Sequence, residues 1–269
     1  MQHWRILEAL DRPASALGVL PQWAALKPQL TLHLYDTLPS TNQMAWQLVQ
    51  QGQGAGTVVI AAQQTAGRGQ WGRTWQSDLG GLYLSLVLEP TMAIAEAPLL
   101  PLASAWGIAT SFVNLGLPVQ VKWPNDLVGH GRKVGGILVE SRLQGKLPHA
   151  VIGVGINWDN SPPANGISLR QLLPDAPRVP MNDLEELAAI VLRGLLQGYY
   201  CWQQQGAPAL IAAYQANLFH LGKNVRVNGH SGRVCGVSTQ GHLAIEVHQS
   251  GQKTIQYLKP GEISLGYNV

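Results

Sequence analysis

The chain of 269 residues contains the stretch Gln64-Thr65-Ala66-Gly67-Arg68-Gly69-Gln70-Trp71-Gly72-Arg73-Thr74-Trp75. Three glycines within six residues cost conformational entropy, so they indicate a backbone that must approach a ligand closely. Arg68 and Arg73 add positive charge that suits an anionic group. The alternative is a solvated surface turn, but turns rarely carry this density of arginine and tryptophan. The stretch therefore predicts a loop that binds an anion.

The glycines at positions 67, 69 and 72 also match the dinucleotide-binding pattern G-x-G-x-x-G. That pattern requires a helix to begin at the loop, so that a pyrophosphate meets the helix N-terminus. Here residues 57–62 predict a buried strand before the loop, and residues 82–88 predict another strand after Gly80-Gly81. No room is left for a crossover helix. A nicotinamide-dependent oxidoreductase stays an alternative that cofactor binding would test.

The composition predicts a folded chain with a large core. Apolar residues make up 46% of the chain and charged residues only 12%. A net charge of +3 without a basic run does not indicate nucleic-acid binding. The two cysteines lie far apart, which excludes a C-x-x-C metal motif and suits a reducing compartment. Because we find no apolar run of membrane-spanning length and no secretory signal, we expect a cytoplasmic protein without a membrane partner.

Three regions are predicted along the chain. Residues 1–30 form an N-terminal extension packed on the domain surface, with a short helix near 6–10. Residues 31–221 alternate between strands and helices and carry the candidate site. Residues 222–269 form a small barrel-like β module of short strands. In the middle region, strands are expected near 32–36, 57–62, 82–88, 119–123, 133–140 and 150–157, and helices near 98–114, 184–203 and 208–218, with another beginning after Ser40 or Thr41.

Polar side chains follow several of the predicted strands. Asn125 and Asp126 come directly after the strand that ends at Trp123, and Asn157 ends the strand at 150–157. Lys133 begins a strand as a point charge, with Asp126 as its counter-charge or as a base. Cationic groups without a nucleophile suit phosphate-ester or nucleotidyl chemistry, in which charge placed against the transition state does most of the catalysis.

Five motifs in this order resemble those of the biotin–protein ligases. They are Ser40-Thr41-Asn42, Gln64 with the glycine-rich loop, 122–127 (Lys-Trp-Pro-Asn-Asp-Leu), 132–140 (Arg-Lys-Val-Gly-Gly-Ile-Leu-Val-Glu) and 153–157 (Gly-Val-Gly-Ile-Asn), and the C-terminal Gly261-Glu262-Ile263-Ser264 also fits. The likeness covers about residues 31–269. It implies an α+β fold in which helices pack on a mixed, largely antiparallel sheet, as in class II synthetases. A small SH3-like β-barrel domain is expected to follow.

The resemblance also implies a two-step reaction. Biotin and MgATP give biotinyl-5′-adenylate and pyrophosphate, and the adenylate then acylates one lysine of the biotin carboxyl carrier protein of acetyl-CoA carboxylase. Mg²⁺ is expected with ATP and not at a fixed protein metal site. The implied catalytic residues are Arg68, Asp126 and Lys133, and Asp126 either helps to deprotonate the acceptor lysine or orients Lys133. The implied biotin contacts are Ser40, Thr41, Asn42, Gln64, Gly67, Arg68, Lys133, Gly135 and Gly136. The implied ATP and adenylate contacts are Arg68, Gly69, Gln70, Arg73, Trp75, Asn125, Lys133 and Asn157.

The chain departs from the family pattern at one position of the loop. Many members have Arg where this chain has Gln70, so we expect faster leakage of the adenylate, with Trp71 compensating by packing. Bifunctional members carry an N-terminal DNA-binding domain, but here the first motif begins at position 40, which predicts no repressor function and no DNA partner. A monomer and a homodimer are both left open. Alternatives are a lipoate–protein ligase, which shares the catalytic fold, and a non-catalytic ligand-binding module.

Overall fold

A seven-stranded sheet forms the centre of the computed structural model, which describes residues 1–91, 96–144, 147–175, 181–227, 230–249 and 252–267. The strand order is β1-β2-β3-β7-β6-β5-β4. The strands are β1 (Thr31–Leu38), β2 (Thr57–Gln64), β3 (Leu82–Leu88), β4 (Val119–Lys122), β5 (Asp126–Gly129), β6 (Arg132–Gln144) and β7 (Leu147–Ile156). Only β1 and β2 pair in parallel, and the other pairs are antiparallel. The mixed, largely antiparallel sheet is thus confirmed, and β6 and β7 form a hairpin within it.

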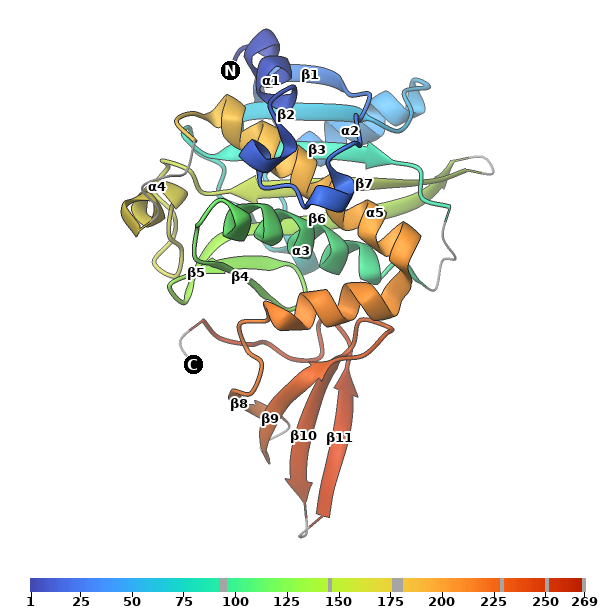
Figure 1. The fold of residues 1–269 in the computed structure, drawn as a ribbon, viewed down its shortest axis with the longest axis vertical. Helices are drawn as coiled ribbons and strands as arrows, with labels where there is room; N and C mark the ends of the chain where they lie inside the picture. Colours follow the sequence, from blue (N-terminus) through green and yellow to red (C-terminus); the bar gives the residue numbers. More distant parts are fainter. Residues whose placement is uncertain (92–95, 145–146, 176–180, 228–229, 250–251, 268–269) are drawn as a thin grey trace.

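Helices cover both faces of this sheet (Figure 1). Helix α2 (Thr41–Gln50) packs on one face, and α3 (Leu99–Asn114) and α5 (Leu184–Ala216) pack on the other. Val58 and Ile60 of β2 belong to the core under α3 and α5, whereas Val59 and Ala61 belong to the core under α2. Because both faces are buried, β2 shows a continuous apolar run instead of an alternating pattern.

Helices α3 and α5 approach each other closely through glycine. A β-carbon at Gly107 would lie 2.1 Å from the carbonyl oxygen of Gly194 on α5. Helix α5 also contains a break at Gly206, whose φ is +79° and ψ is 175°, followed by Pro208. The two helices predicted for 184–203 and 208–218 are the two halves of α5 on either side of this break.

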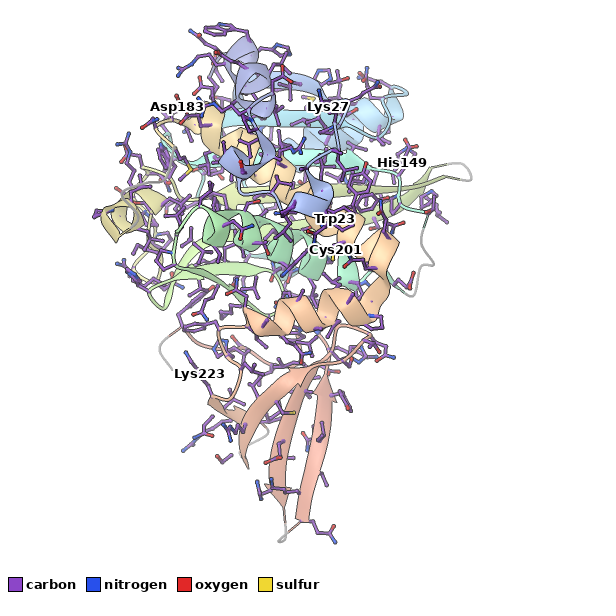
Figure 2. All side chains as sticks on the ribbon, in the orientation of Figure 1. Trp23, Lys27, His149, Asp183, Cys201 and Lys223 are labelled. Carbon is purple, nitrogen blue, oxygen red and sulfur yellow. The ribbon has the colours of Figure 1, made fainter. Side chains whose placement is uncertain are left out.

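The N-terminal residues pack against α5 as α1 (His3–Leu10), η1 (Ala14–Leu17) and η2 (Pro21–Trp23). Ile6 and Leu17 are fully buried in the main core, and Arg12 Nη2 lies 2.5 Å from Glu186 Oε1. Trp23 lies over the helix that carries Cys201 (Figure 2). This segment therefore belongs to the core and is more than a surface extension. The domain boundaries at 30 and 221 stay predictions.

The C-terminal β domain is present as a four-stranded antiparallel sheet below α5 (Figure 1). It contains β8 (Asn224–Val227), β9 (His230–Val237), β10 (Leu243–Gln249) and β11 (Gln252–Leu258), in the order β11-β10-β9-β8. The Trp123 indole donates a hydrogen bond of 2.9 Å to the carbonyl oxygen of Gly241 and joins this domain to the sheet. Short α4 (Leu169–Leu172) and η5 (Leu173–Asp175) lie between β7 and α5. Within the described ranges, no helix has the length and apolar character needed to cross a membrane.

Candidate active site

The glycine-rich loop after β2 folds back on itself as a tight hairpin. Arg68 and Thr74 form an antiparallel bridge, and the Gly69 amide donates to the Arg73 carbonyl oxygen at 2.7 Å. The turn between them, η3 (Gln70–Gly72), has Trp71 at φ +60° and Gly72 at φ +72°, a left-handed conformation that glycine adopts readily. No longer helix opens at this loop, and β3 returns antiparallel to β2. The match to the dinucleotide pattern is therefore coincidental.

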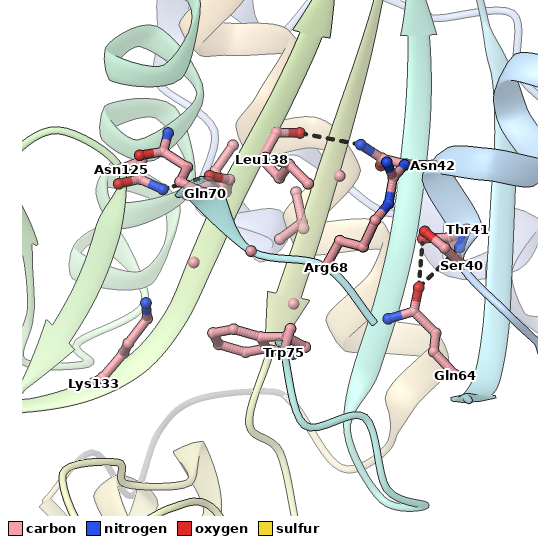
Figure 3. Close-up of a pocket in the computed structure, with 16 residues that line it drawn as sticks. Ser40, Thr41, Asn42, Gln64, Arg68, Gln70, Trp75, Asn125, Lys133 and Leu138 are labelled. Atoms are coloured by element: carbon pink, nitrogen blue, oxygen red, sulfur yellow. Dashed lines mark hydrogen bonds between the residues drawn. The ribbon is translucent and has the colours of Figure 1, made fainter. Parts of the chain in front are cut away.

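Under this loop lies a pocket (Figure 3). It is bounded by the N-terminus of α2, the loop, and strands β6 and β7. Most of the predicted site residues line it, namely Ser40, Thr41, Asn42, Gln64, Arg68, Gly69, Gln70, Trp75, Asn125, Lys133 and Gly136. Residues outside the predicted set complete the lining, namely Ile137, Leu138, Gly153, Val154 and Gly155. The motifs thus meet around one cavity with polar and apolar walls.

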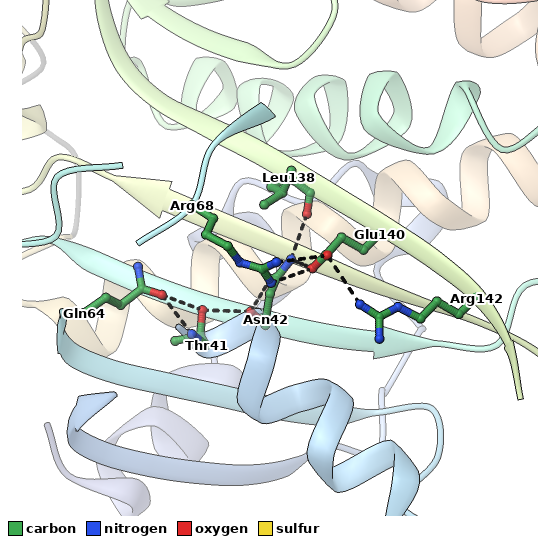
Figure 4. Close-up of polar contacts among 8 residues, drawn as sticks. Thr41, Asn42, Gln64, Arg68, Leu138, Glu140 and Arg142 are labelled. Carbon is green, nitrogen blue, oxygen red and sulfur yellow. Dashed lines mark hydrogen bonds and ion pairs between the residues drawn. The ribbon is translucent and has the colours of Figure 1, made fainter. Parts of the chain in front are cut away.

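The N-terminus of α2 supplies the polar wall (Figure 4). Ser40 occupies the N-cap position without a side-chain capping bond, so helix capping does not explain the Ser-Thr-Asn motif. The Thr41 amide donates to Gln64 Oε1 at 2.8 Å. Ser85 of β3, which is fully buried, places its Oγ 2.8 Å from Thr41 Oγ1 and 2.6 Å from Asn42 Oδ1. Ser85 was missed, although a serine within an apolar buried strand is a signal the sequence contains.

Glu140 near the middle of β6 holds two of the predicted residues together (Figure 4). The Arg68 guanidinium contacts both carboxylate oxygens, at 3.0 and 3.3 Å, and Asn42 Nδ2 donates to Oε2 at 2.8 Å. A bidentate pair of this kind fixes the orientation of the arginine. Glu140 ends one of the sequence motifs but was not predicted as a site residue.

The glycines of β6 and β7 make room for protein side chains. A β-carbon at Gly155 would lie 2.4 Å from Trp75 Nε1, and one at Gly153 would lie 2.2 Å from Asn42 Oδ1. Gly153 and Gly155 also line the pocket, so the space beside these glycines is shared between the pocket and the side chains of Trp75 and Asn42. Gly135 and Gly67 are outside the pocket lining. Each packs closely against protein instead, since a side chain at Gly135 would meet Ile156 and one at Gly67 would meet Ser77 and the Trp75 carbonyl oxygen. Trp75 Nε1 is buried at the pocket and has no hydrogen-bond partner among the described residues.

A charged cluster around Asp126 lies beside the pocket. Lys133 Nζ is 2.6 Å from Asp126 Oδ1, Lys122 Nζ is 3.3 Å from Oδ2, and the Tyr267 hydroxyl donates to Oδ2 at 2.5 Å. Burial alone would raise the pKa of Asp126, but attraction to Lys133 and Lys122 outweighs it and lowers the pKa below its usual value. The carboxylate is therefore ionised at neutral pH and holds Lys133 in place. Tyr267 gave no signal in the sequence.

Two further cavities adjoin the pocket. The first opens between the glycine-rich loop, residues 122–126 and residues 260–265, and Arg73 and Asp126 line it. Asn157 lines the second, where its buried amide donates to the carbonyl oxygens of Lys133 at 3.3 Å and Ile167 at 3.5 Å. Asn157 thus holds the backbone behind Lys133. Because Lys133 lines all three cavities, one cation can contact groups placed in any of them.

Comparisons with known proteins agree with this arrangement. Residues 34–157 match the biotin/lipoate A/B protein ligase family. The biotin–acetyl-CoA-carboxylase ligase of Mycobacterium tuberculosis is 31% identical over 71% of this chain and 74% of its own length. The bifunctional ligase/repressor BirA of Escherichia coli is 34% identical over 78% of this chain and 67% of its own. The biotin protein ligase from Aquifex aeolicus, solved in complex with biotin and ATP, has the same fold, with a TM-score of 0.66 at 24% identity over 84% of this chain and 99% of that one.

Proposed function

Since this chain belongs to the biotin protein ligases, within the biotin/lipoate A/B protein ligase family, we propose that it attaches biotin to a carrier protein in two steps. In the first step, the biotin carboxylate attacks the α-phosphorus of MgATP, which gives biotinyl-5′-AMP and releases pyrophosphate. In the second step, the amine of one lysine on the biotin carboxyl carrier domain of acetyl-CoA carboxylase attacks the acyl carbon, and AMP leaves. The observation that carries this proposal is that the three cavities meet at Lys133.

We assign the pocket under the glycine-rich loop to biotin. The bicyclic ureido ring is uncharged, so it needs neutral hydrogen-bonding groups in an apolar setting. Ser40, Thr41, Asn42 and Gln64 provide the polar groups, and Leu138 and Val154 provide apolar wall. Gly67 and Gly135 act one step away by allowing the loop and strands to pack. The buried Trp75 N–H is available as a donor to the ligand.

The cations are proposed to bring two anions together. A carboxylate and a triphosphate repel each other, and Arg68, Arg73 and Lys133 offset that repulsion where the groups meet. The remaining adenylate contacts come from Gly69, Gln70, Trp75 and Asn125, with Asn157 fixing the backbone of Lys133. Because Asp126 is ionised and shared by two lysines, we propose that it orients Lys133 and is not the base for the acceptor lysine.

Mg²⁺ is proposed to enter as the ATP complex, where it would offset phosphate charge. Asp126 is the acidic side chain nearest to Lys133 and is already paired with it. The glycine-rich loop is expected to close over the adenylate, because a mixed anhydride must be kept from water. A reaction that consumes ATP and modifies a carboxylase subunit suits the cytoplasm, which is the compartment we propose.

We further propose that these 269 residues have no repressor role. In the described structure, residues 1–23 pack on α5, where Ile6 and Leu17 are fully buried, so this segment is engaged in the core. A gel shift at physiological salt with a biotin-operon operator is expected to show no sequence-specific complex. A specific complex that competes with unrelated DNA would contradict this part of the proposal.

The central test is transfer of labelled biotin to a purified carrier domain with MgATP. Biotin-dependent pyrophosphate release is measured in parallel, with lipoate as the competing substrate. We expect activity with biotin and none with lipoate. The Lys133→Ala variant is expected to lose activity, whereas the matched control Lys253→Ala, whose side chain is 65% exposed on the C-terminal domain, should keep it. Activity with lipoate alone, or full activity in Lys133→Ala, would overturn the proposal.

A further inference from the structure

The chain returns to the active site after the C-terminal domain is complete. From β11, residues 259–267 run back so that the described end of the chain lies beside the main domain and not at the far end of the C-terminal sheet (Figure 1). Leu265 is buried, and His220 Nε2 lies 3.1 Å from the Gly266 carbonyl oxygen. These contacts fix the segment immediately before Tyr267.

Tyr267 contacts both Asp126 and Lys122, which pair with each other through one oxygen of the Asp126 carboxylate. Its hydroxyl donates to Oδ2 at 2.5 Å, and Lys122 Nζ, itself 3.3 Å from Oδ2, lies 4.3 Å from the centre of the Tyr267 ring. The other oxygen, Oδ1, is 2.6 Å from Lys133 Nζ. The two carboxylate oxygens thus have different partners. Without the phenol, Oδ2 would keep only the longer contact with Lys122, and the carboxylate could rotate away from Lys133.

We propose that Tyr267 is a positioning residue for adenylate formation, which acts by holding the Asp126 carboxylate so that Oδ1 stays on Lys133. This inference rests on the proposed function, because it assigns Lys133 to the adenylation step. Tyr267 is outside the lining of the biotin pocket. Its effect should therefore appear in the rate of the chemical step and not in the affinity for biotin.

In the hydrogen bond between Tyr267 and Asp126, the Tyr267 hydroxyl is the donor throughout the neutral pH range. Burial, together with the nearby Asp126 charge, raises the pKa of Tyr267 above its usual value, so the phenol stays protonated and donates. The titratable or charged groups around Asp126 and its partners are Lys122 on β4, Lys133 on β6, Arg73 on the loop, Tyr214 on α5, His220 after α5, and Tyr267 itself. Loss of one donor to the carboxylate raises the pKa of Asp126 towards its usual value. Activity that requires ionised Asp126 is then lost at a higher pH than in the wild type.

The test compares Tyr267→Phe with Tyr257→Phe in the full-length enzyme. Tyr257 is 56% exposed on β11 of the same domain and serves as the matched control. The measured quantities are kcat and KM for biotin-dependent pyrophosphate release from about pH 3, below the usual aspartate pKa of about 3.9, up to about pH 9, and the midpoint of thermal unfolding. For Tyr267→Phe we expect kcat to fall on the order of tenfold, the value for one hydrogen bond to a charged group. The KM for biotin should stay within twofold of wild type, and the acidic limb of the kcat profile should move to higher pH.

A double-mutant cycle separates positioning from a general structural role. If Tyr267 acts through Asp126, then Tyr267→Phe should cause no further loss of kcat in an Asp126→Asn background. The inference is wrong if Tyr267→Phe keeps the wild-type kcat and pH profile, or if it lowers kcat by the same factor in both backgrounds. A wild-type enzyme without biotin-dependent pyrophosphate release would overturn the proposed function and this inference with it. An active wild type with an unchanged Tyr267→Phe variant overturns this inference alone.

Discussion

Replacing Ser85 by alanine tests whether the polar wall of the biotin pocket is held in place from β3. The Ser85 hydroxyl carries a single hydrogen, so it donates to Asn42 Oδ1 at 2.6 Å and accepts from Thr41 Oγ1 at 2.8 Å. Ser85→Ala removes both bonds without adding volume. Thr41 and Asn42 can then change rotamer in the unliganded protein. Biotin binding must restore their positions, which costs binding free energy.

The remaining contacts limit the expected loss. A neutral hydrogen bond contributes about 1 kcal/mol, so the two bonds together contribute about 2 kcal/mol. Asn42 keeps its bond of 2.8 Å to Glu140, and the Thr41 amide keeps its bond of 2.8 Å to Gln64. Because these contacts retain about half of the order of Thr41 and Asn42, we expect the variant to lose about 1 kcal/mol of binding free energy for biotin. This loss raises the Kd for biotin about fivefold.

Calorimetric titration with biotin measures this change directly. The matched control is Ser104→Ala, because Ser104 is also buried but donates to the Leu100 carbonyl oxygen within α3, on the other face of the sheet. That control should bind biotin with the wild-type Kd, even if its unfolding midpoint falls. A wild-type Kd in Ser85→Ala would refute the reasoning, as would equal increases in Kd in both variants.

Three further predictions concern the charged cluster, the loop and the C-terminal segment. Lys133→Ala should abolish adenylate formation with unchanged circular dichroism, and detectable adenylate in a rapid-quench assay would count against its role. Gln70→Arg should slow release of biotinyl-adenylate, because a charge-assisted hydrogen bond to phosphate is added, and equal rates of trapped free adenylate would exclude this. Burial lowers the pKa of His220 from 6.5 to about 4. Between these two values the unfolded chain binds a proton that the folded chain does not, so the free energy of unfolding measured in urea should fall as the pH falls from 6.5 towards 4. His220→Gln should flatten that decline, and parallel curves for both proteins would show another group to be responsible.

The central strands could be predicted from sequence because burial on both faces leaves long apolar runs. Residues 57–62 and 82–88 were expected as strands for this reason and are β2 and β3. Strand β5 was missed because it has only four residues and begins within a polar motif. The order in which the strands pair cannot be predicted from local sequence patterns, because partners such as β3 and β7 are far apart in the chain. The burial of Ile6 and Leu17 likewise depends on α5, which follows much later.

The site could be predicted to the level of its motifs but not of their partners. The residues of five separated motifs do line one pocket, because each motif lies at the end or within a strand of the same sheet. Glu140, Ser85 and Tyr267 were missed because each acts on a predicted residue from a different element. The orientation of the strand glycines was also hidden, since only packing shows that Trp75 and Asn42 occupy the space beside them.

The large sheet and the C-terminal region contribute differently to the cavities. The described lining of the proposed biotin pocket comes from residues 40–155, which lie in the large sheet, its loops and the N-terminus of α2. The wider cavity takes its lining both from that region and from residues 260–265. The C-terminal region is joined to this cavity at two tryptophans, through the Trp123–Gly241 hydrogen bond and through Trp71, whose ring would lie 2.9 Å from a β-carbon at Gly261. Under the proposed assignment, biotin is held by residues of the main domain, whereas the wider cavity, in which it would meet ATP, is lined by both regions. The proposed function thus places biotin recognition in the main domain and assigns the C-terminal segment a part in biotin activation.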